Sequence, residues 1–485
     1  MSPYRALLKT KAYLGGKWVE AASGDHFPVV DPARQATVAE VANCGAVDAE
    51  RAVEAGQAAF QTWSRTTAEH RAMVLQQWHD RLLEHQDSLA ALITLEMGKP
   101  LAEARGEVAY AASFLRWFAE EARRVYGEII PASSNDKRLF VLKQPVGVTA
   151  AITPWNFPVA MIARKVAPAL AAGCSMIVKP AEDTPLSALA MAHLFEGLDA
   201  PAGVFNVVPT QDPKEVGKVL TTHSAIRKIS FTGSTATGKK LMKQASDSVK
   251  RVSLELGGNA PFIVFADADM KAAAEGAMVS KYRNGGQTCV CTNRIFLESG
   301  SEQAFLDEFL PLVKQLKVGP GMEEGNQVGP LINEDACKKV ETLVGDAVRQ
   351  GAEVVHGGGR HELGGTYFQP SVLRNANPSM RISQEEIFGP VSVLSTFKSE
   401  GEVIQLANDT PYGLAAYFYS RDTARVWRVA EQLEYGMVGV NTGLVSTAQA
   451  PFGGVKESGI GREGSHHGID EYLEIKYVCL GGLEP

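Results

Sequence analysis

Cysteine is scarce in this sequence, with six residues among 485. The cysteines are scattered, apart from one close pair, and they show neither a disulfide framework nor the spacing of metal ligands. They are Cys44, Cys174, Cys289, Cys291, Cys337 and Cys479. The scarcity excludes a disulfide-stapled secreted scaffold, and we expect a cytoplasmic protein without a bound metal.

Long hydrophobic runs and a strong charge imbalance are also missing. The longest apolar stretch, 159–178, contains Arg164 and Lys165 and is too polar to span a bilayer. Residues 1–18 include basic side chains but no apolar segment long enough for export. The formal net charge of −7 is mild for this length, which argues against nucleic acid or an anionic membrane as a partner.

A chain of 485 residues is too long for one hydrophobic core, so several domains are expected. From residue 146 onward, apolar strands alternate with helices, which indicates a buried parallel sheet, and a second series begins after residue 258. We predict an α/β protein with two Rossmann-like domains, mainly parallel sheets and a small β arm for oligomerisation. The predicted boundaries are 1–125 with 147–257 for the first domain, 258–460 for the second, and 126–146 with 465–485 for the arm.

Helices are predicted ahead of the first sheet, at 48–63 with Asp48 as N-cap, 68–84, 87–97 and 101–126. The arm is predicted from 128–132 and 137–144, which pair as a hairpin. The tail 471–480 alternates between polar and apolar residues and is interpreted as a strand that crosses to a neighbouring subunit.

The segment 285–289, Gly-Gly-Gln-Thr-Cys, follows a predicted helix at 272–284. Two consecutive glycines end a helix, because glycine has the most backbone freedom to regain outside it. Cys289 is therefore expected on a tight turn, held by a following strand at 291–298. A thiol in that position is a candidate nucleophile. The alternative is a small buried core residue, as most free cysteines are.

Three unusual turns follow predicted strands of the first sheet, where parallel sheets bind their ligands. The turn 153–158 holds Asn156 between two prolines, so its rigid amide is a candidate donor to a developing oxyanion. Lys179 and Glu182 follow the next strand and are candidates to bind a ribose. The turn 231–238 enters a helix whose N-terminus attracts phosphate, although its glycines do not match the standard dinucleotide fingerprint. Each feature also has a plain structural interpretation: a turn asparagine, a surface ion pair and an ordinary helix start.

Glu255 lies in an otherwise apolar predicted strand. A carboxylate there has a raised pKa and is suited to be a general base, and the alternative is a buried structural ion pair. Two further loops complete the set, 385–390 with a carboxylate beside an aromatic residue, and the rigid loop 451–454.

Together and in this order, these segments resemble the aldehyde dehydrogenase superfamily along nearly the whole chain. The resemblance implies that Cys289 attacks the aldehyde carbonyl, and that Asn156 and the backbone N–H of Cys289 hold the oxyanion. It also implies that Glu255 activates the water that hydrolyses the resulting thioester. The presence of Glu255 argues against relatives that pass the acyl group to coenzyme A.

The resemblance further implies a nicotinamide dinucleotide site. Its residues would be Trp155, Lys179, Glu182, Gly233, Ser234, Gly257, Glu386 and Phe388. Because the Glu182 carboxylate would accept hydrogen bonds from the ribose hydroxyls and repel a 2′-phosphate, we expect NAD to be preferred, with NADP as the alternative.

Within the superfamily, the sequence is similar to the succinate-semialdehyde dehydrogenases in the blocks 147–165, 281–294, 408–420, 461–464 and 471–477. This resemblance implies that Arg164, Arg283 and Ser446 bind the far carboxylate of the substrate, since a guanidinium group matches a carboxylate bidentately. The plain alternative is that each arginine belongs to an ordinary ion pair. Glutarate semialdehyde is the runner-up, because a hydrophobic pocket separates such homologues by only about 1–3 kcal/mol. A broader aliphatic aldehyde dehydrogenase is a further alternative.

Two other classes of function stay open. Some relatives keep this fold as binding or structural proteins without turnover, but the intact Cys289, Glu255 and Asn156 argue against that. A cysteine hydrolase or acyl transferase would need a histidine partner, and the chain offers only the pair His466 and His467, expected in a solvated turn.

Cys291 lies two residues from the predicted nucleophile. In an extended segment the two side chains point to opposite faces, so a disulfide would need the loop to rearrange. Relatives with this Cys-x-Cys pair are thought to use it as a redox switch, and a packed bystander thiol is the alternative. A homodimer or homotetramer is also expected.

Overall fold

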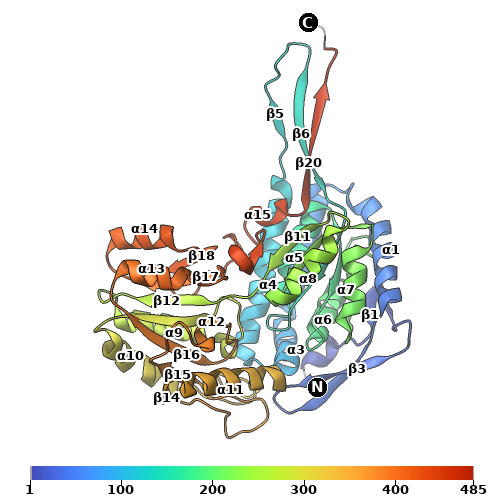
Figure 1. Ribbon diagram of the computed structural model, residues 1–485. Coiled ribbons are helices and arrows are strands. Elements are labelled where there is room, and N and C mark those ends of the chain that lie inside the picture. Colours follow the sequence, from blue (N-terminus) through green and yellow to red (C-terminus); the bar gives the residue numbers. More distant parts are fainter. Residues whose placement is uncertain (1–2, 484–485) are drawn as a thin grey trace.

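An eight-stranded sheet organises the first part of the computed structural model, which describes residues 3–483 (Figure 1). Its strand order is β19-β11-β10-β7-β8-β9-β1-β2, and the strands from β11 to β9 are parallel. The parallel strands are β7 (Val148–Ile152), β8 (Ser175–Lys179), β9 (Phe205–Val207), β10 (Ile226–Thr232) and β11 (Arg251–Glu255). Antiparallel edges are added by β1 (Ala12–Leu14), β2 (Lys17–Val19) and β19 (Gly459–Ile460).

Helices enclose this sheet, so that every residue of β7 and β8 is buried. The helices are α1 (Ala46–Trp63), α2 (Ala68–Glu84), α3 (Gln86–Met97), α4 (Leu101–Glu121), α5 (Ala160–Ala172), α6 (Pro185–Phe195), α7 (Pro213–Thr222) and α8 (Thr235–Ser246). The carboxyl ends of parallel strands meet at one edge of a sheet. Lys179, Thr232 and Glu255, the last residues of three of these strands, therefore lie at the same edge.

A seven-stranded sheet of order β14-β15-β16-β13-β12-β17-β18 organises the second part of the chain. Its strands are β12 (Ala260–Val264), β13 (Thr292–Glu298), β14 (Glu353–His356), β15 (Ser371–Arg374), β16 (Val391–Phe397), β17 (Ala415–Tyr419) and β18 (Met437–Val440). Its helices are α9 (Met270–Tyr282), α10 (Glu302–Lys314), α11 (Glu334–Arg349), α12 (Arg381–Gln384), α13 (Glu400–Asn408) and α14 (Thr423–Gln432). All neighbouring strands are parallel except β14, which pairs with β15 in the opposite direction.

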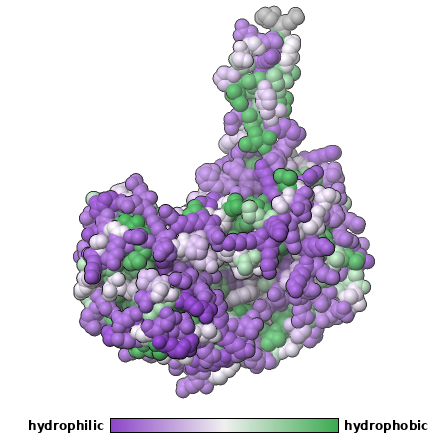
Figure 2. All heavy atoms as spheres, in the orientation of Figure 1, coloured by the Kyte–Doolittle hydropathy of each residue, from purple (hydrophilic) through white to green (hydrophobic). Residues whose placement is uncertain are grey.

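A three-stranded arm projects from the first domain (Figure 1). It contains β5 (Glu128–Ile130), β6 (Arg138–Pro145) and β20 (Leu473–Leu480). Apolar residues gather along it (Figure 2), and the Ile129 and Ile475 side chains are largely exposed. The tail strand β20 pairs along its whole length with β6 of the same chain. In this structure β20 therefore extends the sheet of its own chain and does not cross to a neighbouring subunit. An oligomeric role of the arm stays a prediction.

The remaining elements are short. They are the hairpin β3 (His26–Asp31) and β4 (Ala36–Ala42), the helix α15 (His467–Asp470) and the 3₁₀ turns η1 (Pro3–Ala6), η2 (Ala122–Arg124), η3 (Arg283–Gly286) and η4 (Lys456–Ser458). Within residues 3–483, the structure has no helix that is both long and apolar enough to cross a membrane.

Several predicted boundaries differ from the structure. Asp48 is not the N-cap of α1 but its third residue, and its carboxylate accepts a hydrogen bond from the backbone N–H of Gly45, the actual N-cap, at 3.1 Å. The helix predicted at 101–126 ends at Glu121 and continues only as a 3₁₀ turn. The second predicted domain, 258–460, ends with β19, which pairs with β11 of the first sheet. The chain therefore returns to the first domain before it reaches the tail.

Candidate active site

A short turn after α9 places Cys289. The helix ends at Tyr282, two residues earlier than predicted, and Asn284, Gly285 and Gly286 then adopt left-handed φ values of 55°, 61° and 74°. A side chain at Gly286 is excluded, because its Cβ would lie 2.2 Å from the carbonyl oxygen of Gly389. The glycines are therefore required by the left-handed turn and by this close approach of another loop.

Asn156 is joined directly to the segment that carries the cysteine. Its side chain is buried, and its Nδ2 donates a hydrogen bond to the carbonyl of Gln287 at 3.1 Å. The Asn284 Nδ2 donates to the backbone carbonyls of both Asn156 and Gln287, each at 3.1 Å. The predicted oxyanion donor and the predicted nucleophile therefore lie on two segments that are hydrogen-bonded to each other.

Sequence reasoning missed an ion pair that supports this arrangement. Lys99 and Glu107 are buried and paired at 2.7 Å, and the Lys99 Nζ donates to the carbonyl of Asn156 at 2.6 Å. Glu107 also accepts hydrogen bonds from the backbone N–H groups of Val159 and Ala160, at 2.8 and 3.2 Å, at the start of α5. The signal in the sequence was a glutamate between the core-facing residues of a predicted amphipathic helix.

Glu255 is the last residue of β11 and is 3% exposed. Burial and the neighbouring charge of Glu463 raise the pKa of Glu255 well above its ordinary value, and Arg164 and Lys165 only partly oppose this rise. The Glu255 Oε2 accepts no hydrogen bond from residues 3–483. A protein carboxylate that is buried, incompletely hydrogen-bonded and raised in pKa is suited to accept a proton from water.

Glu463 is a second buried carboxylate that the sequence analysis did not single out. It pairs with Arg164 at 2.7 Å and with Lys165. Burial pushes the pKa of Glu463 upward, but the two cations outweigh burial and hold it below its ordinary value. The predicted substrate residue Arg164 is therefore already part of a buried ion pair.

Two cavities meet at Cys289. One, of about 250 Å³, is also lined by Asn156. The other, of about 20 Å³, is also lined by Arg164, Arg283 and Ser446, the three residues predicted to bind the substrate. No histidine among residues 3–483 lines either cavity, and the His466–His467 pair lies at the start of α15. This arrangement removes the support for a cysteine–histidine hydrolase.

The larger of these two cavities contains most of the predicted cofactor residues. They are Trp155, Gly233, Ser234, Gly257, Glu386 and Phe388. The predicted residues Lys179 and Glu182 do not line it and form an ion pair of 3.1 Å at the end of β8.

The chemistry of this cavity fits a dinucleotide. Ser234 is the N-cap of α8, so the N-terminus of that helix faces the cavity and favours phosphate. Glu386 accepts a hydrogen bond from the Gly258 N–H at 3.1 Å, and burial raises its pKa to about 7. A carboxylate there is a suitable acceptor for ribose hydroxyls. Trp155 and Phe388 meet edge to face at 5.5 Å on the wall.

The surroundings of Cys289 disfavour its thiolate form. Burial raises the pKa of its thiol to about 12, and the positive charge of Arg164 only partly opposes this effect. Glu255 and Glu386 raise the pKa further. Nucleophilic attack by this sulfur therefore requires that a base remove the proton, or that bound ligands change the local field.

Cys291 does not lie in an extended segment, contrary to the prediction. Its backbone N–H donates to the carbonyl of Thr288 at 3.1 Å, which closes a turn, and β13 begins only at Thr292. The argument that Cys289 and Cys291 point to opposite faces of a strand is therefore wrong. The Cys291 thiol is buried, and its Sγ contacts the carbonyl of Lys281 at 3.5 Å. A redox role of Cys291 stays a prediction.

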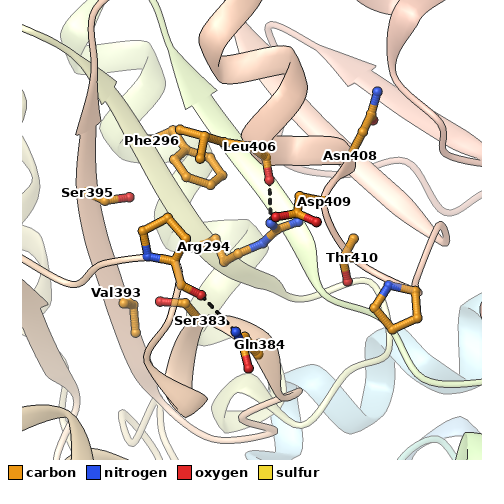
Figure 3. A pocket seen from close by; sticks show the side chains of 12 residues that line it. Arg294, Phe296, Ser383, Gln384, Val393, Ser395, Leu406, Asn408, Asp409 and Thr410 are labelled. Carbon is orange, nitrogen blue, oxygen red and sulfur yellow. Dashed lines mark hydrogen bonds between the residues drawn. The ribbon is translucent and has the colours of Figure 1, made fainter.

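A cavity of about 510 Å³, larger than either of the two at Cys289, is a separate feature of the second domain (Figure 3). Arg294 projects into it and donates to the carbonyls of Leu406 and Ala407, at 2.8 and 2.9 Å, at the end of α13. None of Cys289, Glu255 and Asn156 lines this cavity. Size alone therefore does not identify the candidate active site.

Comparison with known proteins shows similarity over almost the whole chain. Residues 18–478 match the sequence model of the aldehyde dehydrogenase family. A 3-sulfolactaldehyde dehydrogenase of Pseudomonas putida is 56% identical over 99% of this chain and 98% of its own. A glutarate-semialdehyde dehydrogenase of Pseudomonas aeruginosa is 56% identical over 98% of this chain and 99% of its own.

An NADP(+) succinate-semialdehyde dehydrogenase of Escherichia coli is 54% identical over 98% of both chains. Among solved structures, a succinate-semialdehyde dehydrogenase from Burkholderia pseudomallei superposes with a TM-score of 0.97. It is 57% identical, and the match covers 98% of this chain and 99% of that one. The similarity therefore extends to both domains and to the arm.

Proposed function

Because this chain belongs to the aldehyde dehydrogenase family, we propose that it oxidises succinate semialdehyde to succinate with NAD(P), through a covalent intermediate on Cys289. The observation that carries the choice of substrate is the cavity in which Arg283, Arg164 and Ser446 accompany Cys289. The compounds after which the three relatives are named each contain an anionic group besides the aldehyde. A cationic wall beside the nucleophile suits such substrates.

The proposed mechanism assigns one role to each residue. Deprotonated Cys289 attacks the aldehyde carbonyl, and the Asn156 side chain and the Cys289 N–H donate hydrogen bonds to the resulting oxyanion. The carbon of this thiohemiacetal loses a hydride when it becomes a thioester, and bound NAD(P) would supply the acceptor for that hydride. Glu255 then removes a proton from the water that attacks the thioester, which releases the acid and the Cys289 thiol.

Arg283 is the arginine with capacity to bind the substrate carboxylate. No ion pair joins it to any other residue of 3–483, and its guanidinium group lies 5.5 Å from the centre of the Phe157 ring. Arg164, in contrast, is already paired with the Glu463 carboxylate, which also pairs with Lys165. We therefore assign the main contact to Arg283 and a supporting one to Arg164 and Ser446.

Arg283→Ala is expected to raise KM for succinate semialdehyde about 10- to 100-fold, because a charge-assisted bidentate contact is lost. The KM for butanal, which has no carboxylate, should change less than about threefold, since Arg283 makes no ion pair that the substitution would break. Arg283→Lys keeps the charge without the fork geometry and should give an intermediate KM. Equal changes for both aldehydes would refute the assignment. Steady-state kinetics with saturating cofactor make the comparison.

The proposed function is tested with a substrate panel of succinate semialdehyde, glutarate semialdehyde and butanal, each measured with NAD and NADP. We expect the highest kcat/KM for succinate semialdehyde. The kcat/KM for glutarate semialdehyde should be lower by about 10- to 200-fold, because one methylene group separates the two substrates. We also propose that NAD is preferred, because the half-exposed Glu182 carboxylate would repel a 2′-phosphate. A higher kcat/KM for another aldehyde, or for NADP, contradicts the corresponding part of the proposal.

Assembly into a homodimer or homotetramer through the arm belongs to the same proposal. Its exposed apolar side chains, Ile129, Ile475 and Tyr477, support an interface there. Sedimentation equilibrium of the purified protein tests the oligomeric state. A cytoplasmic location is also proposed, for which fractionation of the producing cell is the test.

A further inference from the structure

The segment 383–388 separates two cavities. Glu386, Ile387 and Phe388 line the cofactor cavity, whereas Ser383 and Gln384 line the larger cavity of the second domain (Figure 3). Of these side chains, only Ile387 is fully buried in an apolar cluster. Apolar packing therefore anchors this segment mainly at Ile387, and hydrogen bonds have to determine where the Glu386 carboxylate lies.

Asn293 supplies those hydrogen bonds on both sides of Glu386. Its Nδ2 donates to the carbonyl of Glu385 at 2.9 Å, and its Oδ1 accepts from the N–H of Ile387 at 2.9 Å. The other Nδ2 proton goes to the Oδ1 of Asn259 at 2.7 Å. The amide orientation is unambiguous, because a flipped amide would place its oxygen against two acceptor oxygens.

Asn259 holds the earlier part of the same segment. Its side-chain Nδ2 donates to the backbone carbonyl of Ser383 at 3.0 Å. Its backbone carbonyl accepts hydrogen bonds from the Nε and Nη2 atoms of Arg294, at 3.3 and 2.9 Å. Asn259 directly follows Gly258, whose N–H donates to the Glu386 carboxylate. Both asparagines are almost completely buried.

We propose that the Asn293–Asn259 amide pair positions the 383–388 segment and thereby holds Glu386 in the geometry that binds the cofactor ribose. The pair connects three parts of the site, since Asn293 follows Cys289 by four residues and Asn259 follows Glu255 by four. Neither side chain lines the cofactor cavity, so both are positioning residues. The inference rests on the proposed use of NAD(P).

Asn293→Asp tests the proposal with little change in shape. The carboxylate keeps an acceptor for the Ile387 N–H but turns an oxygen, instead of a donor, towards the Glu385 carbonyl and Asn259 Oδ1. We expect the dissociation constant of NAD(P), measured by isothermal titration calorimetry without aldehyde, to rise at least about tenfold. Hydrolysis of p-nitrophenyl acetate without cofactor, which uses Cys289 and Glu255 but not the dinucleotide, should stay within about twofold of the parent.

Asn206→Asp is the matched control. Asn206 is equally buried, accepts a hydrogen bond from the Gly15 N–H at 2.9 Å and donates to the Gly203 carbonyl at 2.6 Å, but it lines neither cavity. Its substitution imposes the same chemical change and should leave the cofactor dissociation constant within about twofold of the parent. An equal loss of cofactor affinity in both variants would overturn the proposal.

Two other results would also overturn it. One is an unchanged cofactor dissociation constant in folded Asn293→Asp, and the other is a loss of ester hydrolysis as large as the loss of cofactor affinity. If Asn293→Asp does not fold, Asn259→Asp removes the contacts with the Ser383 and Gln384 carbonyls, at 3.0 and 3.4 Å, and should weaken cofactor binding in the same direction. A parent protein that binds neither NAD nor NADP would instead defeat the proposed function.

Discussion

Cys289→Ser is expected to lower kcat for aldehyde oxidation at least about 10⁴-fold, the scale on which loss of a nucleophile acts in other covalent enzymes. A serine hydroxyl at this partly buried position is far harder to deprotonate than a thiol, and the charges of Glu255 and Glu386 would disfavour its alkoxide further. The acyl intermediate would also be an ester, which is less reactive than a thioester. Stopped-flow measurement of NADH formation checks both the burst and the steady state.

Cys291→Ser is the control for that experiment. This neighbouring thiol is buried in the turn after Cys289 and lines neither cavity at the nucleophile. Its basal kcat should stay within about threefold of the parent. Activity above about 1% of the parent in Cys289→Ser would reject Cys289 as the nucleophile.

Glu255→Gln is expected to separate the two halves of the reaction. The burst should remain near one NADH per active site, because oxidation to the thioester does not need the hydrolytic base. The steady-state kcat should fall about 10²- to 10⁴-fold, because the water that releases the acid is no longer activated. Glu385→Gln is the matched control, since this carboxylate pairs with Arg381 at 2.7 Å and is not part of the cofactor cavity.

The pH dependence of the parent enzyme follows from the same group. Burial and Glu463 raise the pKa of Glu255, so the base carries a proton, and cannot accept another, until the pH exceeds that raised value. The kcat of the parent should therefore still increase with pH at pH values well above the ordinary pKa range of a carboxylate. The kcat of Glu255→Gln should not show this increase.

A different outcome would change the assigned role. If the burst and the steady state fall together in Glu255→Gln, then Glu255 acts before the thioester forms. Deprotonation of Cys289, whose pKa burial raises to about 12, would then be the step that needs Glu255. The two measurements together decide between thiol activation and thioester hydrolysis.

Local patterns predicted much of this molecule. Continuous apolar stretches identified buried strands such as β7 and β8. Helix periodicity predicted α2 with the same first and last residues that the structure shows. Asn156 was proposed because it lies in a rigid turn after a strand of the first sheet, and Glu255 because it is a carboxylate in an otherwise apolar strand. These signals are local, so one sequence is enough to see them.

Other features depend on partners far apart in the chain and were missed. Glu463 comes almost 300 residues after Arg164 and pairs with it, which is why we proposed Arg283 as the main substrate contact. The Lys99–Glu107 pair supports the Asn156 loop from a helix with no motif of its own. The strand predicted at 291–298 begins one residue later, at Thr292, because the Cys291 N–H donates to the Thr288 carbonyl and closes a turn.

The sequence by itself determined the α/β class and the family, and it was enough to propose Cys289, Glu255 and Asn156 as catalytic residues, because composition, periodicity and ordered motifs are properties of the chain alone. Only the tertiary structure decided which charges face each other. Burial sets the pKa of Cys289 and Glu255, and the return of residues 459–463 to the first sheet brings Glu463 beside Arg164. Charge pairing and desolvation depend on distances through space, which spacing along a chain does not contain.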